Sequence, residues 1–238
     1  YLGIAIALSG AMQGSSGGFW IDIIQLIIDG LIITGFMFSS RFINDLMMLG
    51  YVNNDAECIK KSTGADGSES VGNTAVGMVE AAMYIATGFI LHASLSGGGG
   101  SFFQGILSTI VFFIIGQFTL LILGLVYELI TPFNVKNEIQ ANNPAAGIGL
   151  GGSIIALGII LMGSISGPFT GWGADIAGFG IYALFGIVML MVCRIIIDRL
   201  LLPTTNIAIE VEEDKNVAAL LVVESAVIAI AVIISFSM

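Results

Sequence analysis

The stretch EIQANNPAAGIGLGGSIIALGIILMGSISG, residues 138–167, has a charged start, an Asn143-Pro144 pair, about twenty apolar or small residues and a Ser-Gly end. Proline is favoured at the first position of a helix, and an asparagine just before it can accept a hydrogen bond from a free backbone amide. About twenty apolar residues are enough to cross the hydrocarbon core of a bilayer. The stretch therefore predicts a membrane-spanning helix that opens at Asn143.

Five further segments of the 238-residue chain are comparably long and apolar. The mean hydropathy is +1.01, 56% of the residues are hydrophobic and only 10% are charged. A soluble domain averages about 25% charged residues, so an ordinary soluble globule is excluded. We predict an all-α fold, a polytopic transmembrane helix bundle. The expected spans are Phe19–Leu49, Val71–Ser96, Phe102–Phe133, Asn143–Ser166, Trp172–Leu202 and Asn216–Met238.

The first twelve residues, Tyr1–Met12, are apolar but too short to span a bilayer. They contain Leu8-Ser9-Gly10, which is similar to the Leu-Ser-Gly and Ile-Ser-Gly ends of two later spans. We expect residues 1–12 to be the outer half of a truncated helix whose first half would lie upstream of Tyr1.

The loops predict the orientation of the chain in the membrane. All seven basic residues lie in or beside the charged loops 50–70, 134–142 and 203–215, and none lies beside the Gly/Ser-rich loops. Because Lys and Arg gather on the cytoplasmic side, the charged loops are expected to be cytoplasmic and Met238 to lie outside. The net charge of −10 argues against nucleic acid as a partner.

A two-helix unit recurs along the chain. Three asparagines that open spans, Asn73, Asn143 and Asn216, are each followed by a serine 21 residues later. A carboxylate lies upstream of each of them, at Glu69, Glu138 and Glu212. In the alternate helices a second pattern recurs after 153 residues, in which Asp22, Arg41 and Asp45 correspond to Asp175, Arg194 and Asp198.

These patterns predict a single transmembrane domain, 1–238, built of tandem hairpins at 19–96, 102–166 and 172–238. A unit of two helices returns the chain to the same side of the membrane, so the copies run parallel rather than inverted.

The segment EIQANNPAAG, Glu138–Gly147, and the glycine-rich run after it resemble the YjfL-type bacterial inner-membrane family, a domain of unknown function. The resemblance covers most of the chain and is strongest over Glu138–Gly167. It departs in the third copy, where Glu210–Lys215 is more charged and Val217 replaces a Pro or Thr. The resemblance brings no established activity. It points toward envelope maintenance, because relatives often sit beside genes for membrane-stress and phage-shock-type proteins.

The polar residues of the spans allow two interpretations each. Asn73, Asn143 and Asn216 are expected to cap their helices, or alternatively to converge in a polar ring at the cytoplasmic face. The membrane-edge pairs are expected to anchor the chain, with arginine reaching toward lipid headgroups, or alternatively to dock a partner or act in gating. These pairs are Arg41/Asp45 and Arg194/Asp198.

Three carboxylates inside the spans, Asp29, Glu80 and Glu224, are candidates for an ion or proton pathway. They lie about 10–15 Å from their helix starts at 1.5 Å per residue, and we expect no Lys or Arg at that depth. Such an acid must be protonated, face water or meet a cation. The alternatives are a neutral acid that hydrogen-bonds between helices, or a helix end that is wetter than its depth suggests.

Catalytic chemistry has little support in the sequence. His92 is the only histidine, and Cys58 and Cys193 are the only cysteines, so no zinc cluster or Ser-His-Asp triad can be built. We expect a protein that is not an enzyme, holds no cofactor and assembles with itself or a membrane partner among lipids. A proton- or cation-coupled transporter or channel is the alternative.

Overall fold

The computed structural model describes residues 1–13, 18–47, 54–59, 61–63, 69–96, 102–167, 169–201 and 206–237. The all-α polytopic class is confirmed, since six described helices are long and apolar enough to cross a membrane. The elements are α1 (Leu2–Ala11), α2 (Phe19–Met47), α3 (Asn54–Ile59), β1 (Lys61–Thr63), β2 (Glu69–Val71), α4 (Thr74–Ser96), α5 (Phe102–Ile130), α6 (Val135–Gln140), α7 (Pro144–Ile165), α8 (Trp172–Leu201), the π-helix η1 (Ile209–Glu213) and α9 (Val217–Ser235).

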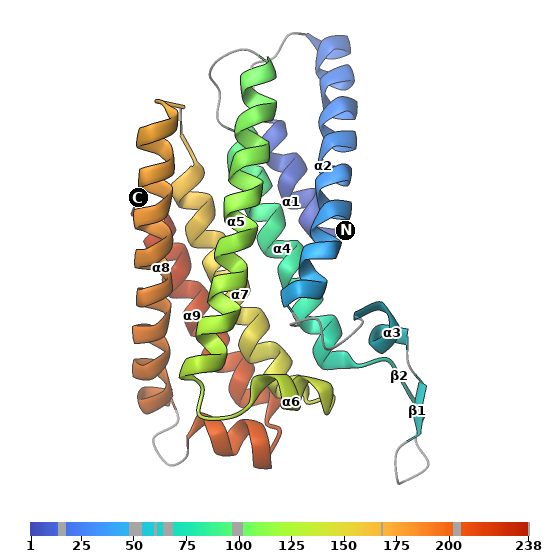
Figure 1. Cartoon of the computed structure of the whole chain (residues 1–238), viewed down its shortest axis with the longest axis vertical. Coiled ribbons are helices and arrows are strands. Elements are labelled where there is room, and N and C mark those ends of the chain that lie inside the picture. Colours follow the sequence, from blue (N-terminus) through green and yellow to red (C-terminus); the bar gives the residue numbers. More distant parts are fainter. Residues whose placement is uncertain are drawn as a thin grey trace.

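The helices form two layers (Figure 1). Helices α1, α4, α7 and α9 make an inner row of neighbouring helices, and α4 and α7 share its most extensive contact. Helices α2, α5 and α8 lie in front of this row and cross it obliquely. Each long helix that an asparagine opens, α4, α7 and α9, is therefore in the inner row, and the three helices of the other kind are in the outer layer.

Small residues explain the close packing of the inner row. A Cβ atom added at Gly158 of α7 would lie 2.7 Å from Ala86 Cα of α4, and one added at Gly88 of α4 would lie 2.5 Å from the Gly3 carbonyl oxygen of α1. Apolar burial gives little attraction between helices in lipid, so such backbone approach is a main source of association. The glycines therefore set the spacing of the row.

The outer layer leaves much of its apolar surface uncovered. Large side chains such as Leu31 of α2, Phe118 of α5 and Leu184 of α8 are more than 60% exposed. Exposed apolar stripes on helices of this length match a hydrocarbon environment rather than water.

Short elements connect the outer helices to the inner ones at the asparagine end. α3, α6 and η1 occupy these connections, and in each a glutamate carbonyl accepts a hydrogen bond from the asparagine that follows. The three bonds are Asn73 N to Glu57 O at 2.8 Å, Asn143 N to Glu138 O at 3.0 Å and Asn216 N to Glu210 O at 2.7 Å. This common geometry supports the predicted three-hairpin division, which stays a prediction.

The first connection contains an antiparallel hairpin that the sequence did not predict. β1 pairs with β2 in the register Lys61 to Val71, Ser62 to Ser70 and Thr63 to Glu69. The expected span that starts at Val71 is corrected by it, because Val71 belongs to β2 and the helix begins at Thr74.

The close contact between α4 and α7 in the inner row can be tested by adding one methyl group at Gly158. Gly158→Ala is expected to lower the free energy of unfolding by about 1–3 kcal/mol, because the methyl must push α4 away. The measurement is SDS-induced unfolding of the purified protein in mixed micelles. Gly180→Ala in α8 is the matched control, since a Cβ there meets nothing within 4 Å. Equal stability of the two variants would contradict the close-packed row.

Candidate functional site

The three asparagines make the hydrogen bonds of helix N-caps. The side-chain oxygen of Asn73 accepts from the Val76 amide at 3.0 Å and that of Asn143 from the Ala145 amide at 3.0 Å. That of Asn216 accepts from the amide of the third residue after it at 3.1 Å. Each bond satisfies one of the amides that a helix start leaves free.

The amide nitrogens of the same side chains reach further. Asn73 Nδ2 donates to the Ile139 carbonyl at 2.8 Å, and Asn143 Nδ2 donates to the Val211 carbonyl at 2.7 Å. In both cases the acceptor lies in the connection that precedes the next inner helix. Two caps therefore also tie one hairpin to the following one.

A fourth asparagine takes part that the sequence patterns did not single out. Asn142 has a positive φ of 56°, and its side-chain oxygen accepts from the Thr74 amide at 2.7 Å and the Ala75 amide at 3.4 Å. It thus caps α4 from the connection of the next hairpin. The sequence feature that could have indicated this role is the pair of asparagines at 142–143, because asparagine adopts the left-handed backbone region more readily than most residues.

The three upstream carboxylates lie differently relative to their asparagines. Glu138 does receive a hydrogen bond from Asn143 Nδ2 at 2.7 Å, but the partner of Asn216 is Glu210 at 2.7 Å rather than Glu212. Glu69 lies in β2. The partners differ because the connections differ in length and η1 lies before Asn216. The caps follow the row α4, α7, α9 rather than a closed ring, because α7 packs between the other two helices.

A buried ion pair lies deeper in the bundle, between α8 and α9. Arg194 Nη1 donates to Glu224 Oε1 at 2.8 Å and to Ser153 Oγ of α7 at 3.1 Å, and that hydroxyl lies 3.3 Å from Glu224 Oε2. The side chains of Arg194 and Glu224 are 8% and 3% exposed. An opposite charge and a hydroxyl therefore compensate the carboxylate inside the protein.

The neighbours of the pair are an aromatic ring and two glycines. The guanidinium carbon of Arg194 lies 4.4 Å from the ring centroid of Tyr127 on α5, a cation–π distance. A Cβ at Gly149 would lie 2.7 Å from the Tyr127 hydroxyl, and one at Gly152 would lie 2.5 Å from Glu224 Cβ. The glycine run of α7 thus makes room for the charged groups.

The ion pair corrects two expectations. The prediction that no basic residue lies at the depth of the carboxylates is wrong for Glu224, and Arg194 does not extend to the headgroups as an anchor. Seven residues separate Arg194 from the end of α8, about 10 Å, and eight separate Glu224 from Asn216, about 12 Å. The two side chains therefore meet at one level. The side chain of Asp198 lies outside the described residues.

The other candidate residues are separate from this pair. Asp29 on α2 is 8% exposed and accepts from Gln25 Nε2 at 3.1 and 3.3 Å. Glu80 on α4 is half-buried, and its Oε1 accepts a hydrogen bond from the Tyr84 hydroxyl at 3.4 Å. Arg41 and Asp45 are half-buried near the end of α2. Within the described residues, no three His, Cys, Asp or Glu side chains are placed to hold a metal ion.

Comparison with known proteins identifies the family. The Domain of Unknown Function (DUF350) matches residues 1–95 and 101–238. The chain belongs to this family. The UPF0719 transmembrane protein of Aquifex aeolicus (strain VF5) is 24% identical over 163 residues, which are 68% of this chain and 60% of that protein's length. No solved structure matches the chain. The predicted membership in a membrane-protein family of unknown function is confirmed.

Because the ion pair is buried, we expect the free energy of unfolding of this DUF350 chain to depend strongly on both Arg194 and Glu224. Arg194→Met should lower the free energy of unfolding by about 3–5 kcal/mol, because it leaves the Glu224 carboxylate uncompensated in a buried site. The double variant Arg194→Met/Glu224→Gln should recover most of that loss. SDS unfolding of the four forms of this double-mutant cycle measures the coupling.

Arg199→Met is the matched control, since Arg199 is exposed on the same helix. Additive losses in the cycle, or equal losses for Arg194→Met and Arg199→Met, would contradict a coupled buried pair.

Proposed function

We propose that this protein is a non-enzymatic assembly subunit of the bacterial inner membrane, which associates with further copies of itself or with a membrane partner. The observation that carries the proposal is the open side of α9. This helix packs on α7 and α8, but no further helix of the described chain covers its other side. A row of similar helices thus ends at a surface on which another helix can pack.

The composition of that side supports close helix packing. The uncovered stripe of α9 contains three small and two branched residues, all of them exposed: Ala218, Val222, Ser225, Ala229 and Ile233. Small residues let helix backbones approach each other in lipid, and serine can hydrogen-bond across such a contact.

The buried polar groups also support a structural role. Arg194 donates to one carboxylate oxygen of Glu224, and the Ser153 hydroxyl lies 3.3 Å from the other. The asparagine caps are bonded through both their oxygens and their nitrogens. Groups that bond one helix to another are typical of a stable scaffold. The family resemblance supports placing that scaffold in envelope maintenance.

The orientation is part of the proposal. Lys136, Arg199 and Lys215 lie in connections or helix ends at the asparagine-capped end, and Arg41 lies near the same end of α2. Positive residues favour the cytoplasmic side, which supports cytoplasmic charged loops and an external C-terminus.

A proton- or cation-coupled transporter or channel is the second candidate, and Asp29 is the observation that favours it. This carboxylate is 8% exposed, lies ten residues into α2, and has no ion pair among the described residues. An uncompensated acid at that depth is costly unless it binds a proton or a cation. Liposome flux that is lost in Asp29→Asn would favour this candidate over assembly.

The assembly proposal is tested by disulfide cross-linking. Ser225→Cys, in a chain whose Cys58 and Cys193 are replaced by alanine, is expected to give covalent dimers in native membranes on mild oxidation. The fraction cross-linked is read on a non-reducing gel. Ile181→Cys is the control, because this residue is 67% exposed but lies on the outer helix α8.

Cross-linking of both variants to the same extent would indicate random collision. Monomers by mass measurement in native lipid particles, together with no cross-link at Ser225→Cys, would overturn self-assembly through α9.

A further inference from the structure

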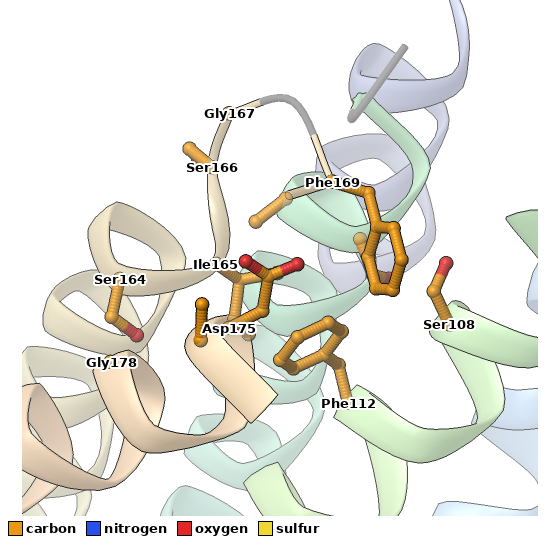
Figure 2. A pocket seen from close by; sticks show the side chains of 12 residues that line it. Ser108, Phe112, Ser164, Ile165, Ser166, Gly167, Phe169, Asp175 and Gly178 are labelled. Atoms are coloured by element: carbon orange, nitrogen blue, oxygen red, sulfur yellow. The ribbon is translucent and has the colours of Figure 1, made fainter. Parts of the chain in front are cut away.

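A cavity of about 170 Å³ lies at the end of the bundle opposite the asparagine caps, among α4, α5, α7 and α8 (Figure 2). Figure 2 shows the Asp175 carboxylate and the rings of Phe112 and Phe169 facing the same space. A water molecule takes up about 30 Å³ in the liquid, so the cavity has room for a small organic group. The assembly role proposed above does not use this cavity.

Two of the three serines of the predicted repeat lie here. Ser94 and Ser164, each 21 residues after an inner-row asparagine, both line the cavity, together with Ser108 and Ser166. Equivalent positions of two hairpins thus supply hydroxyls to one site.

The hydroxyl groups of this cavity are acceptors toward a ligand. Each of the four serines donates its hydroxyl proton to a carbonyl of its own helix, three or four residues earlier, at 2.7–3.1 Å. A hydroxyl that has given its one proton retains oxygen lone pairs only. These serines can therefore accept hydrogen bonds from a ligand but cannot donate to it.

The carboxylate adds a fixed negative charge. Asp175 is held by Thr170, whose hydroxyl donates to Oδ1 at 2.5 Å and whose backbone amide donates to Oδ2 at 3.1 Å. The Gly171 amide adds a third bond, at 3.4 Å. A carboxylate has about four acceptor positions, so one is left for a ligand. No basic residue is among the residues that line the cavity.

The aromatic rings complete a cationic preference. Phe112 is 5% exposed, and Phe169 is held edge-on by Trp172 with ring centroids 5.0 Å apart. The face of an aromatic ring attracts cations. The hydrogen-bond acceptors and the one negative charge select a positively charged donor and disfavour an anion, and the two aromatic rings are compatible with a cation.

We propose that this cavity binds a primary ammonium group, supplied either by an aminophospholipid headgroup or by a free small amine. The ammonium donates to the Asp175 carboxylate, the serine oxygens give the cavity wall a lining of hydrogen-bond acceptors, and the alkyl part of the ligand lies against Phe112 and Phe169. Ser94, Ser164 and Asp175 are the determinants of this specificity.

The binding test uses ethanolamine and the fluorescence of Trp172 in the Trp20→Phe variant of the 238-residue chain in detergent. Ethanolamine is expected to change the emission in a saturable way, and ethylene glycol, its neutral analogue, is not. Asp175→Asn should raise the apparent Kd for ethanolamine roughly tenfold or more, because it removes a charge-assisted hydrogen bond.

Two further variants complete the experiment. Asp22→Asn, at the corresponding position of α2, should leave the affinity unchanged. Ser108→Phe fills the cavity without altering Asp175 and should abolish the response, which keeps the test decisive if Asp175→Asn does not fold. No saturable response, an equal response to ethylene glycol, or an unchanged affinity in folded Asp175→Asn would overturn the proposal.

The source of the ammonium group is resolved in lipid particles. With phosphatidylethanolamine present, native mass spectrometry of the unmodified chain is expected to show one retained lipid that Asp175→Asn loses, if the headgroup is the ligand. If free ethanolamine binds but that lipid is not selectively retained over phosphatidylglycerol, the ligand is a free amine. Either result supports the ammonium site, and the absence of both contradicts it.

Discussion

The hydrogen bonds at the helix starts are the interaction on which the rest of this structure depends. A helix start leaves backbone amides without partners, and water is scarce near the hydrocarbon core. Asn73, Asn143 and Asn216 satisfy such amides with their oxygens, and two of them also bind the next connection with their nitrogens. Helix capping and the joining of neighbouring hairpins are therefore achieved by the same side chains.

The close inner row follows from this junction and from glycine. Once the capped ends are held together, the backbones of α4, α7 and α9 can run in contact only where side chains are absent, as at Gly147 and Gly158. The same glycine-rich face of α7 leaves room for the Arg194–Glu224 pair next to Ser153. A charged pair is thereby enclosed in a bundle whose outer surface is apolar.

Fold class and helix positions could be predicted from sequence because each depends on a local pattern, a run of apolar residues or an asparagine before it. The ion pair could not, because it depends on which faces of α8 and α9 turn toward each other, and that is set by packing. The hairpin β1–β2, the cap from Asn142 and the choice of Glu210 over Glu212 were missed for a related reason, since they depend on the geometry of connections of unequal length. The serine pattern was visible in the sequence, but only the crossing of α4, α5, α7 and α8 turns it into a cavity.

The most direct test of the account is amide hydrogen exchange at the start of α4 in Asn142→Gly. Glycine keeps the positive φ of position 142 but removes the side chain that caps α4 from the next hairpin. The Thr74 and Ala75 amides should exchange roughly 2- to 13-fold faster, since a hydrogen bond contributes about 0.5–1.5 kcal/mol to stability. The Val76 amide, which Asn73 caps, should keep its protection. Unchanged exchange at Thr74 and Ala75 would contradict the claim that asparagine side chains join the hairpins.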